Sequence, residues 1–174
     1  SLDRVLSVGR LEKQKDFKYL IEEIAGLNIQ LDIVGEGSEK IDLQNFADEK
    51  NVNVNFLGKS DHEELENLYK EYCIYVSSSN YEGNPKTVLE ALSFGCVTIL
   101  SNIPNHKELV DHSKTGFIFD KKEGSLRQMF ESILNNEYDL SSISKEGFSY
   151  VQNNNSLQRS VDVEMKDYNY LLQK

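Results

Sequence analysis

Two glutamates seven residues apart mark the segment with the clearest chemical potential. Glu82 and Glu90 lie within residues 81–92, where a loop runs into an apolar helical pattern. Carboxylates accept hydrogen bonds from hydroxyl groups. A pair placed on either side of a diphosphate could therefore hold a sugar and a ribose. The alternative is that Glu82 is a solvated loop residue and Glu90 a surface helix residue.

The start of that helix could bind phosphate. Asn84 is a favoured N-cap residue, and Pro85 suits the first helical position. Free backbone N–H groups near Lys86 and Thr87 would then attract an anion, and Lys86 adds positive charge. Glu90 lies about six residues into the helix, roughly 7–9 Å along its axis.

A basic cluster follows the first apolar run, at residues 9–15. Arg10 and Lys15 could both reach a diphosphate, because arginine offers a bidentate fork and lysine a point charge. The alternative is a solvated basic loop that leads into a helix.

Short apolar runs alternate with amphipathic helical patterns and must position these loops. We expect strands at residues 4–8, 31–34, 52–57, 73–76, 97–100 and 116–119. Helices are expected between them, including a capping box at residues 61–64 and a helix over 85–94. This order predicts an α/β fold with a doubly wound, Rossmann-like parallel sheet of five or six strands and helices on both faces. Ligands of such sheets bind beyond the carboxyl ends of the strands.

One domain over residues 1–174 accounts for the chain, with a sheet core at about 4–120 and extra C-terminal helices at about 121–174. Apolar stripes mark those helices at Leu126, Met129, Phe130, Ile133 and Leu134, and at Leu157, Val161, Met165, Tyr168 and Leu172.

Composition limits the partners. The net charge of −10 over 174 residues disfavours nucleic acid and anionic membranes. No stretch approaches 18 apolar residues. Cys73 and Cys96 adjoin apolar runs and are predicted to be buried, reduced thiols, which weakly indicates a cytosolic location.

Other candidate sites are weaker. His62, His106 and His112 lack metal-ligand spacing and are predicted to lie at the surface. The Gly35-Glu36-Gly37 turn does not follow the first strand and lacks the third glycine of a dinucleotide site. The tyrosines at 69, 72, 75 and 81 are expected to serve in packing.

Together these motifs resemble the C-terminal, donor-binding domain of retaining GT-B-fold glycosyltransferases of family 4, the Glu-x7-Glu group. The resemblance covers residues 4–120. Besides Glu82 and Glu90, it rests on Gly9-Arg10-Leu11 with Lys15, Val34 to Gly37, Phe56-Leu57-Gly58, Leu89 to Leu92 with Gly95, Glu108, and Thr115-Gly116.

The resemblance implies a role for each matching position. Arg10 and Lys15 would hold the diphosphate and stabilise the departing nucleotide, and Glu82 would bind hydroxyls of the transferred sugar; these three form the implied catalytic set. Glu90 would bind the ribose hydroxyls. The implied donor-binding set is Gly9, Arg10, Lys15, Gly35, Gly58, Lys59, Ser60, Glu82, Gly83, Asn84, Pro85, Lys86, Thr87 and Glu90. No metal or other cofactor is implied.

Two departures from the family pattern bear on donor binding. Asn84-Pro85 stands where the family often has Phe-Gly, and a proline cannot donate a backbone hydrogen bond. Ile103-Pro104-Asn105 replaces a common Gly-Gly turn, and we expect this change to alter sugar selectivity.

The implied function is that of a hexosyltransferase donor domain. UDP-sugar is the expected donor, and the setting is cell-envelope polysaccharide synthesis in the cytoplasm or at the inner face of the membrane. The chain opens Ser1-Leu2-Asp3, so we expect a fragment that lacks its N-terminal acceptor-binding partner domain, binds donor and transfers nothing alone. The alternatives are an epimerase-like GT-B enzyme and a non-catalytic Rossmann-like binding module.

Overall fold

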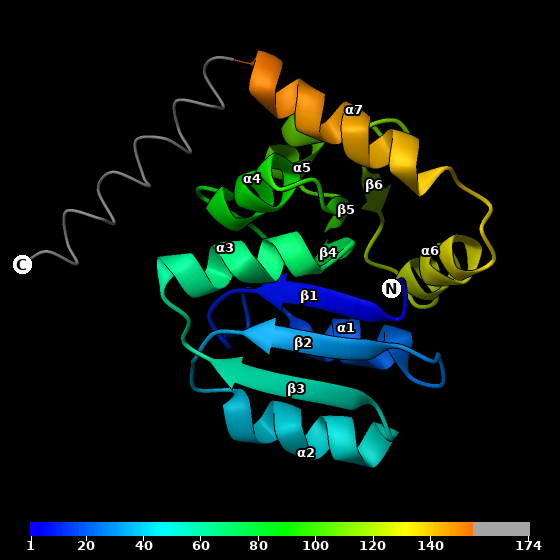
Figure 1. Cartoon of the computed structure of the whole chain (residues 1–174). Helices are drawn as coiled ribbons and strands as arrows, with labels where there is room; N and C mark the ends of the chain where they lie inside the picture. Colours follow the sequence, from blue (N-terminus) through cyan, green and yellow to red (C-terminus); the bar gives the residue numbers. More distant parts are fainter. Residues whose placement is uncertain (155–174) are drawn as a thin grey trace, which may run out of the picture.

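A computed structural model describes residues 1–154, and a six-stranded parallel sheet forms the centre of these residues (Figure 1). The strand order is β3-β2-β1-β4-β5-β6. The strands are β1 (Arg4–Val8), β2 (Gln30–Val34), β3 (Asn53–Gly58), β4 (Ile74–Ser77), β5 (Val97–Ser101) and β6 (Phe117–Phe119). The predicted doubly wound sheet is confirmed, and the strand ends shift by only one residue or so.

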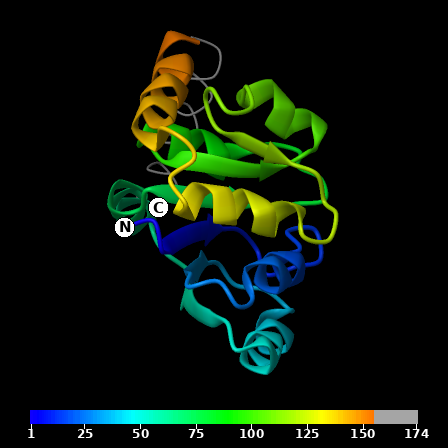
Figure 2. The same ribbon diagram turned by 90° about the vertical axis from the view of Figure 1, so that its right-hand side faces the viewer.

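Helices cover both faces of the sheet (Figure 2). One face carries α1 (Phe17–Ile24), α2 (Lys40–Lys50) and α6 (Ser125–Leu134), and the other carries α3 (His62–Glu71), α4 (Lys86–Ser93) and α7 (Leu140–Asn153). The short helix α5 (Pro104–Leu109) packs Leu109 into the second layer. Successive residues of a strand pack alternately into the two core layers, because neighbouring side chains of a strand point to opposite faces of the sheet. In β1, Val5 joins the first cluster and Leu6 the second.

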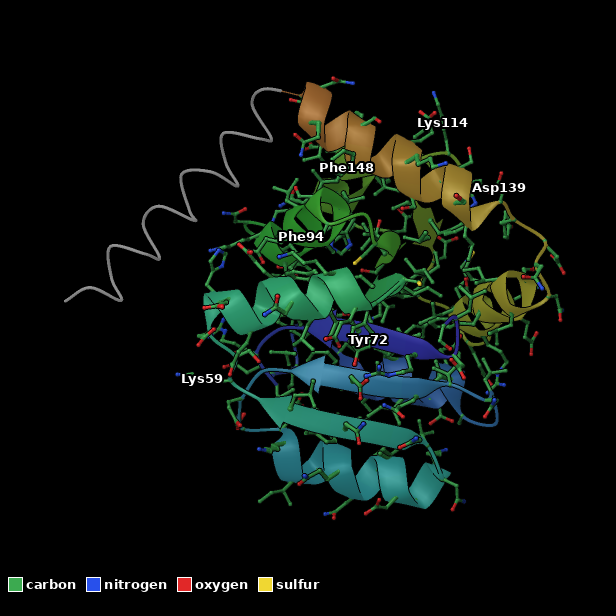
Figure 3. The ribbon with its side chains drawn as sticks, viewed as in Figure 1. Lys59, Tyr72, Phe94, Lys114, Asp139 and Phe148 are labelled. Atoms are coloured by element: carbon green, nitrogen blue, oxygen red, sulfur yellow. The ribbon has the colours of Figure 1, made fainter. Side chains whose placement is uncertain are left out.

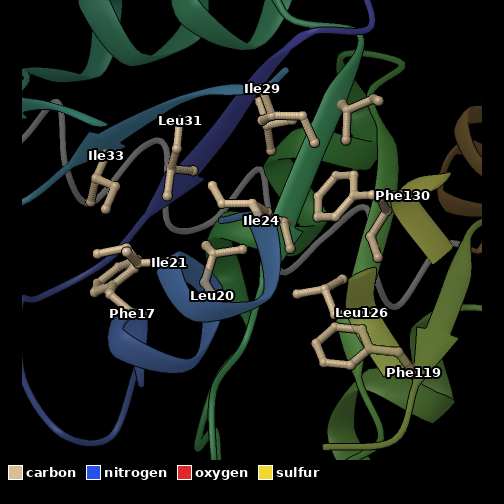
Figure 4. Close-up of a cluster of buried hydrophobic side chains, with 14 of the residues drawn as sticks. Phe17, Leu20, Ile21, Ile24, Ile29, Leu31, Ile33, Phe119, Leu126 and Phe130 are labelled. Atoms are coloured by element: carbon tan, nitrogen blue, oxygen red, sulfur yellow. The ribbon is translucent and has the colours of Figure 1, made fainter. Parts of the chain in front are cut away.

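The larger core lies between the sheet and helices α1 and α6 (Figure 4). Phe17, Leu20, Ile21 and Ile24 form the buried face of α1, as their spacing predicts. From α6, Leu126, Phe130 and Ile133 are buried against the same layer, whereas Met129 and Leu134 are only partly buried. Fully burying each large side chain contributes about 1.5–3 kcal/mol. The predicted stripe over 157–172 lies outside the described residues.

The capping box of α3 is confirmed. Asp61 accepts a hydrogen bond from the Glu64 backbone N–H at 2.9 Å, and Glu64 accepts one from the Asp61 N–H at 3.0 Å. The structure therefore begins this helix where the sequence signature places it.

Two predictions about burial are wrong. Cys96 is a buried free thiol, and burial raises its pKa to about 12, but Cys73 is exposed. Cys73 precedes β4 at the edge where α3 ends, so its neighbours in sequence are buried although it is not. His106, expected at the surface, is fully buried, because its short helix packs against the sheet edge.

Within residues 1–154, no helix is both long and apolar enough to cross a membrane.

Helices α1 and α6 are joined by a buried carboxylate. Glu23 is 3% exposed and accepts hydrogen bonds from the backbone N–H groups of Gly124, Leu126 and Arg127 at 2.7, 2.9 and 3.0 Å. It thus satisfies the N-terminus of α6 from another helix.

We predict that Glu23→Ala lowers the free energy of unfolding by about 2–4 kcal/mol, because it leaves buried N–H groups without a charged acceptor. The neighbouring Glu22→Ala is the matched control. It removes a half-exposed ion pair with Lys50 and is expected to cost about 0.5 kcal/mol. Urea unfolding followed by circular dichroism measures both, and equal losses would contradict this account.

Candidate functional site

The chain reverses its direction across the sheet between β1 and β4. These neighbours pair in parallel, with Val5 opposite Ile74 and Leu6 opposite Tyr75. From β1 the chain moves outward to β2 and β3, and it then returns to β4. Ligands of doubly wound sheets bind at such a switch point, beyond the carboxyl ends of the strands. The loops over residues 9–16 and 78–85 meet there.

Hydrogen bonds tie these two loops together. The Asn80 backbone N–H donates to the Gln14 carbonyl at 2.8 Å, and the Gln14 side chain donates to the Tyr81 carbonyl at 2.9 Å. Ser78 Oγ donates to the Lys15 carbonyl at 2.9 Å. The backbone at Lys15 is therefore fixed relative to the loop that carries Glu82.

Lys15 and Glu82 form a short ion pair at this junction. Lys15 Nζ lies 2.5 Å from Glu82 Oε1, and Ser79 Oγ donates to the same oxygen at 2.6 Å. The lysine side chain is 17% exposed and the glutamate side chain 7%. Glu82 is therefore not a solvated loop residue, and the 9–15 loop is not simply a solvated basic loop.

Glu90 is also buried, at 3% exposure, on the face of α4 that meets α3. Tyr69 donates its hydroxyl to Glu90 Oε2 at 3.0 Å, and Lys86 Nζ lies 3.9 Å from Oε1. Burial raises the pKa of Tyr69 well above its ordinary value, so its hydroxyl stays protonated and can donate. The tyrosine expected to serve only in packing thus also orients this carboxylate.

The start of α4 differs from the prediction. Pro85, rather than Asn84, occupies the N-cap position, and Lys86 is the first helical residue. Pro85 has no side-chain oxygen, so the N-cap residue itself makes no side-chain hydrogen bond to the first N–H groups of α4. A helix N-terminus at this edge of the sheet is a position where phosphate can bind.

Glycines allow the turns after β1 and β2 to touch. Gly35 has a φ of +147°, and a Cβ there would lie 1.9 Å from the Gly9 carbonyl oxygen. At Gly58, φ is +75°, which also favours glycine. A Cβ at Gly9 would approach Lys15 Cε to 2.8 Å. These turns are close-packed around the lysine stem.

The remaining predicted site residues line the edge more loosely. Arg10 is 71% exposed and lies 3.4 Å from Glu12, away from the Lys15–Glu82 pair. Lys59 projects into solvent beyond β3, and Ser60 beside it is half-buried (Figure 3). Gly83 and Asn84 are exposed, and Thr87 lies within hydrogen-bond distance of the buried Tyr75 hydroxyl at 2.8 Å.

The structure brings three further polar residues to this edge. The motifs did not indicate Ser79 or His106, whereas Asn105 lies in the segment expected to alter sugar selectivity. Asn105 Nδ2 donates to the carbonyls of Glu82 and Gly83, at 2.6 and 3.2 Å, and Ser79 holds the Glu82 carboxylate. His106 Nδ1 donates to the Ser101 carbonyl at 2.9 Å. The run of serines at 77–79, directly after a buried strand, was a signal that could have indicated Ser79.

The buried imidazole of His106 couples stability to pH. Burial lowers the pKa of His106 below 6.5, and the neighbouring Lys15 contributes in the same direction. At pH values between the pKa of His106 in the folded protein and 6.5, the unfolded chain binds more protons than the folded chain. The contribution of neutral His106 to the free energy of unfolding is therefore complete above pH 6.5 and is lost as the pH falls.

We predict that lowering the pH from 7.5 to 5.5 destabilises the native chain more than the His106→Gln variant, which keeps an amide donor but does not titrate. The native chain should lose up to about 1.4 kcal/mol more of its free energy of unfolding than the variant for each pH unit below 6.5. Urea midpoints at both pH values measure it. An identical pH dependence in the two proteins would show that His106 does not titrate on unfolding.

Solved structures share this fold. The catalytic domain of cholesterol-alpha-glucosyltransferase from Helicobacter pylori superposes with a TM-score of 0.78 at 21% identity, over 88% of this chain and 99% of that one. Sucrose-phosphate synthase from Thermosynechococcus elongatus gives 0.82 at 24% identity, over 99% of this chain and 46% of that one. The sheet is thus that of the C-terminal domain of GT-B glycosyltransferases.

Curated relatives are longer than this chain. An uncharacterised glycosyltransferase of Haemophilus influenzae is 34% identical over 67% of this chain, which spans 35% of that protein. UDP-Gal:alpha-D-GlcNAc-diphosphoundecaprenol alpha-1,3-galactosyltransferase of Escherichia coli is 32% identical over 65% of this chain, which spans 31% of that protein. Residues 3–149 match the family described as Glycosyl transferases group 1. The chain belongs to this family.

Proposed function

We propose that this chain is the donor-binding domain of a retaining hexosyltransferase of family 4, which takes its sugar from a nucleoside diphosphate sugar. The observation that carries the proposal is the Lys15–Glu82 pair, held at 2.5 Å where β1 and β4 meet, with Glu82 in the loop that leads into α4. A partly buried ammonium beside a partly buried carboxylate suits a ligand that carries both negative charge and hydroxyl groups.

The diphosphate would lie between Lys15 and the N-terminus of α4. An ammonium has three N–H donors and Glu82 Oε1 takes one, so Lys15 keeps donors for phosphate oxygens. Lys86 and the helix dipole add positive potential from the other side. Arg10, which is exposed and lies 3.4 Å from Glu12, would turn toward the same group when the donor binds.

Two carboxylates would then bind the two ends of the donor. Glu90, fixed by Tyr69, would accept the ribose hydroxyls, and Glu82 would accept hydroxyls of the transferred sugar. The loop over Gly58, Lys59 and Ser60 would border the nucleobase. Gly9, Gly35, Gly83, Asn84, Pro85 and Thr87 would border the bound donor.

Catalysis would follow from charge stabilisation at the departing nucleotide. Negative charge develops on the diphosphate as its bond to the sugar breaks, and Lys15 and Arg10 would stabilise it in the transition state. The side chains and the helix terminus supply this positive potential, so we propose turnover without a metal. We also propose that the product keeps the anomeric configuration of the donor.

UDP is the proposed nucleotide. Several relatives carry UDP-sugars in their names, and HepE of Anabaena, with a TM-score of 0.81 at 17% identity, was determined with UDP and glucose. The diphosphoundecaprenol acceptor in the name of one relative supports a role in cell-envelope polysaccharide synthesis at the cytoplasmic face of a membrane. An N-terminal acceptor domain would complete the active site, and this chain alone would not transfer sugar.

We predict that the chain binds UDP in the presence of EDTA and that Lys15→Ala weakens binding about 10–100-fold, because a charge-assisted contact is lost. The matched control is Lys13→Ala, which removes the same charge from an exposed position in the same loop and should change affinity less than about twofold. Calorimetric titration with UDP, GDP and ADP measures this. Binding that requires a divalent metal would contradict the proposal.

In the full-length protein that the proposal implies, Glu82→Gln should lower kcat/KM about 100-fold, since an ionic acceptor for the sugar is lost in the transition state. Glu63→Gln, on the exposed surface of α3, is the control and should leave turnover unchanged. Proton NMR of the product gives its anomeric configuration. A non-catalytic module would show no turnover in any variant, and an inverted product would refute retention.

A further inference from the structure

We propose that Asn105 is a positioning residue that sets the selectivity of the site for the transferred sugar. This inference rests on the proposed function and deepens it. One amide nitrogen binds two consecutive carbonyls, because Asn105 Nδ2 donates to Glu82 O at 2.6 Å and to Gly83 O at 3.2 Å. Both carbonyls belong to the loop whose side chain is the proposed sugar acceptor.

The loop is tied to the 9–16 loop as far as Tyr81, but the Glu82-Gly83 turn that follows has little other backbone support. Within residues 1–154, no backbone-to-backbone hydrogen bond reaches Glu82 or Gly83. Gly83 is exposed, and a Cβ there would meet nothing within 4 Å, so packing does not confine it either. A glycine without neighbours has the widest choice of backbone conformations. The two bonds from Asn105 therefore select one conformation of the Glu82-Gly83 turn.

The side chain of Glu82 is fixed from the opposite direction. Lys15 and Ser79 both bind Oε1, while Asn105 binds the backbone of the same residue. With one oxygen held and the backbone held, Oε2 has a defined position at the edge of the site. The direction in which it meets a sugar hydroxyl thus depends on Asn105.

The contacts that orient Glu90 and Thr87, at the proposed ribose end of the site, do not involve Asn105. Glu90 is oriented by Tyr69 at 3.0 Å and Thr87 by Tyr75 at 2.8 Å, and both tyrosines lie in the layer of α3 and β4. Neither contact passes through the 82–84 turn or through α5. Loss of the Asn105 bonds should therefore change recognition of the sugar and spare recognition of the nucleotide.

Asn105→Asp is the sharpest test, because it keeps the shape of the side chain and replaces a donor with an acceptor that repels both carbonyls. Asn105→Ala removes the donor without adding charge. The matched control is Asn102→Asp, on the same segment, which alters a hydrogen bond to Asp120 at 2.7 Å and leaves the 82–84 turn alone.

Calorimetry on the 174-residue chain gives the dissociation constants for UDP and for UDP-glucose, UDP-galactose and UDP-N-acetylglucosamine. We expect Asn105→Asp to lower affinity for the preferred UDP-sugar about tenfold relative to UDP, and Asn105→Ala to lower it severalfold. UDP affinity should stay within about twofold in Asn105→Ala, and Asn102→Asp should keep the native ratio.

Equal losses for UDP and UDP-sugar would show a merely structural role for Asn105 and overturn the proposal, as would an unchanged ratio in both variants. If the native chain binds UDP and the variants keep its sugar preference, the inference fails and the donor site stands. If the native chain binds neither UDP nor any UDP-sugar, the proposed function fails and this inference fails with it.

Discussion

The parallel pairing of β1 with β4 is the constraint on which the site depends. It places the loops after these strands against each other, so that Lys15 and Glu82, 67 residues apart in sequence, lie in contact. The pairing of β1 with β2 likewise brings the turns after these strands together, and a Cβ at Gly35 would have no room beside the Gly9 carbonyl. An ion pair buried to this degree is stable only when its remaining polar atoms are also bonded. Ser79 provides that bond, and the backbone links between the loops keep the geometry fixed.

Buried polar groups recur throughout the domain, and most have partners from distant elements. Glu23 holds the N-terminus of α6, and Glu90 is held by Tyr69. Asp32, in the middle of β2, accepts bonds from Tyr72 and Asn55, which together with other donors keep its pKa below the ordinary value despite burial. A buried carboxylate without such partners would cost several kcal/mol. These pairs join α1 to α6, α4 to α3, and β2 to the residue that ends α3, in addition to the contacts of the apolar core.

The proposed site has two parts with separate supports. The helix α4 carries the proposed nucleotide contacts, and its orientation comes from apolar packing and from tyrosines in the layer beneath it. The turn before α4 carries the proposed sugar contact, and it is held by Ser79 from the loop after β4 and by Asn105 from α5.

The sequence by itself determined the sheet, the order of its elements and the edge where the site lies, because apolar periodicity and turn residues are local properties. It also determined that residues around Glu82 and Glu90 open a helix. Only the tertiary structure decided that Lys15 binds Glu82, that Asn105 holds the turn, and that His106 is buried while Cys73 is not. These contacts join side chains from different strands and loops. They form only when the layers pack in three dimensions, and a local sequence pattern carries no information about that packing.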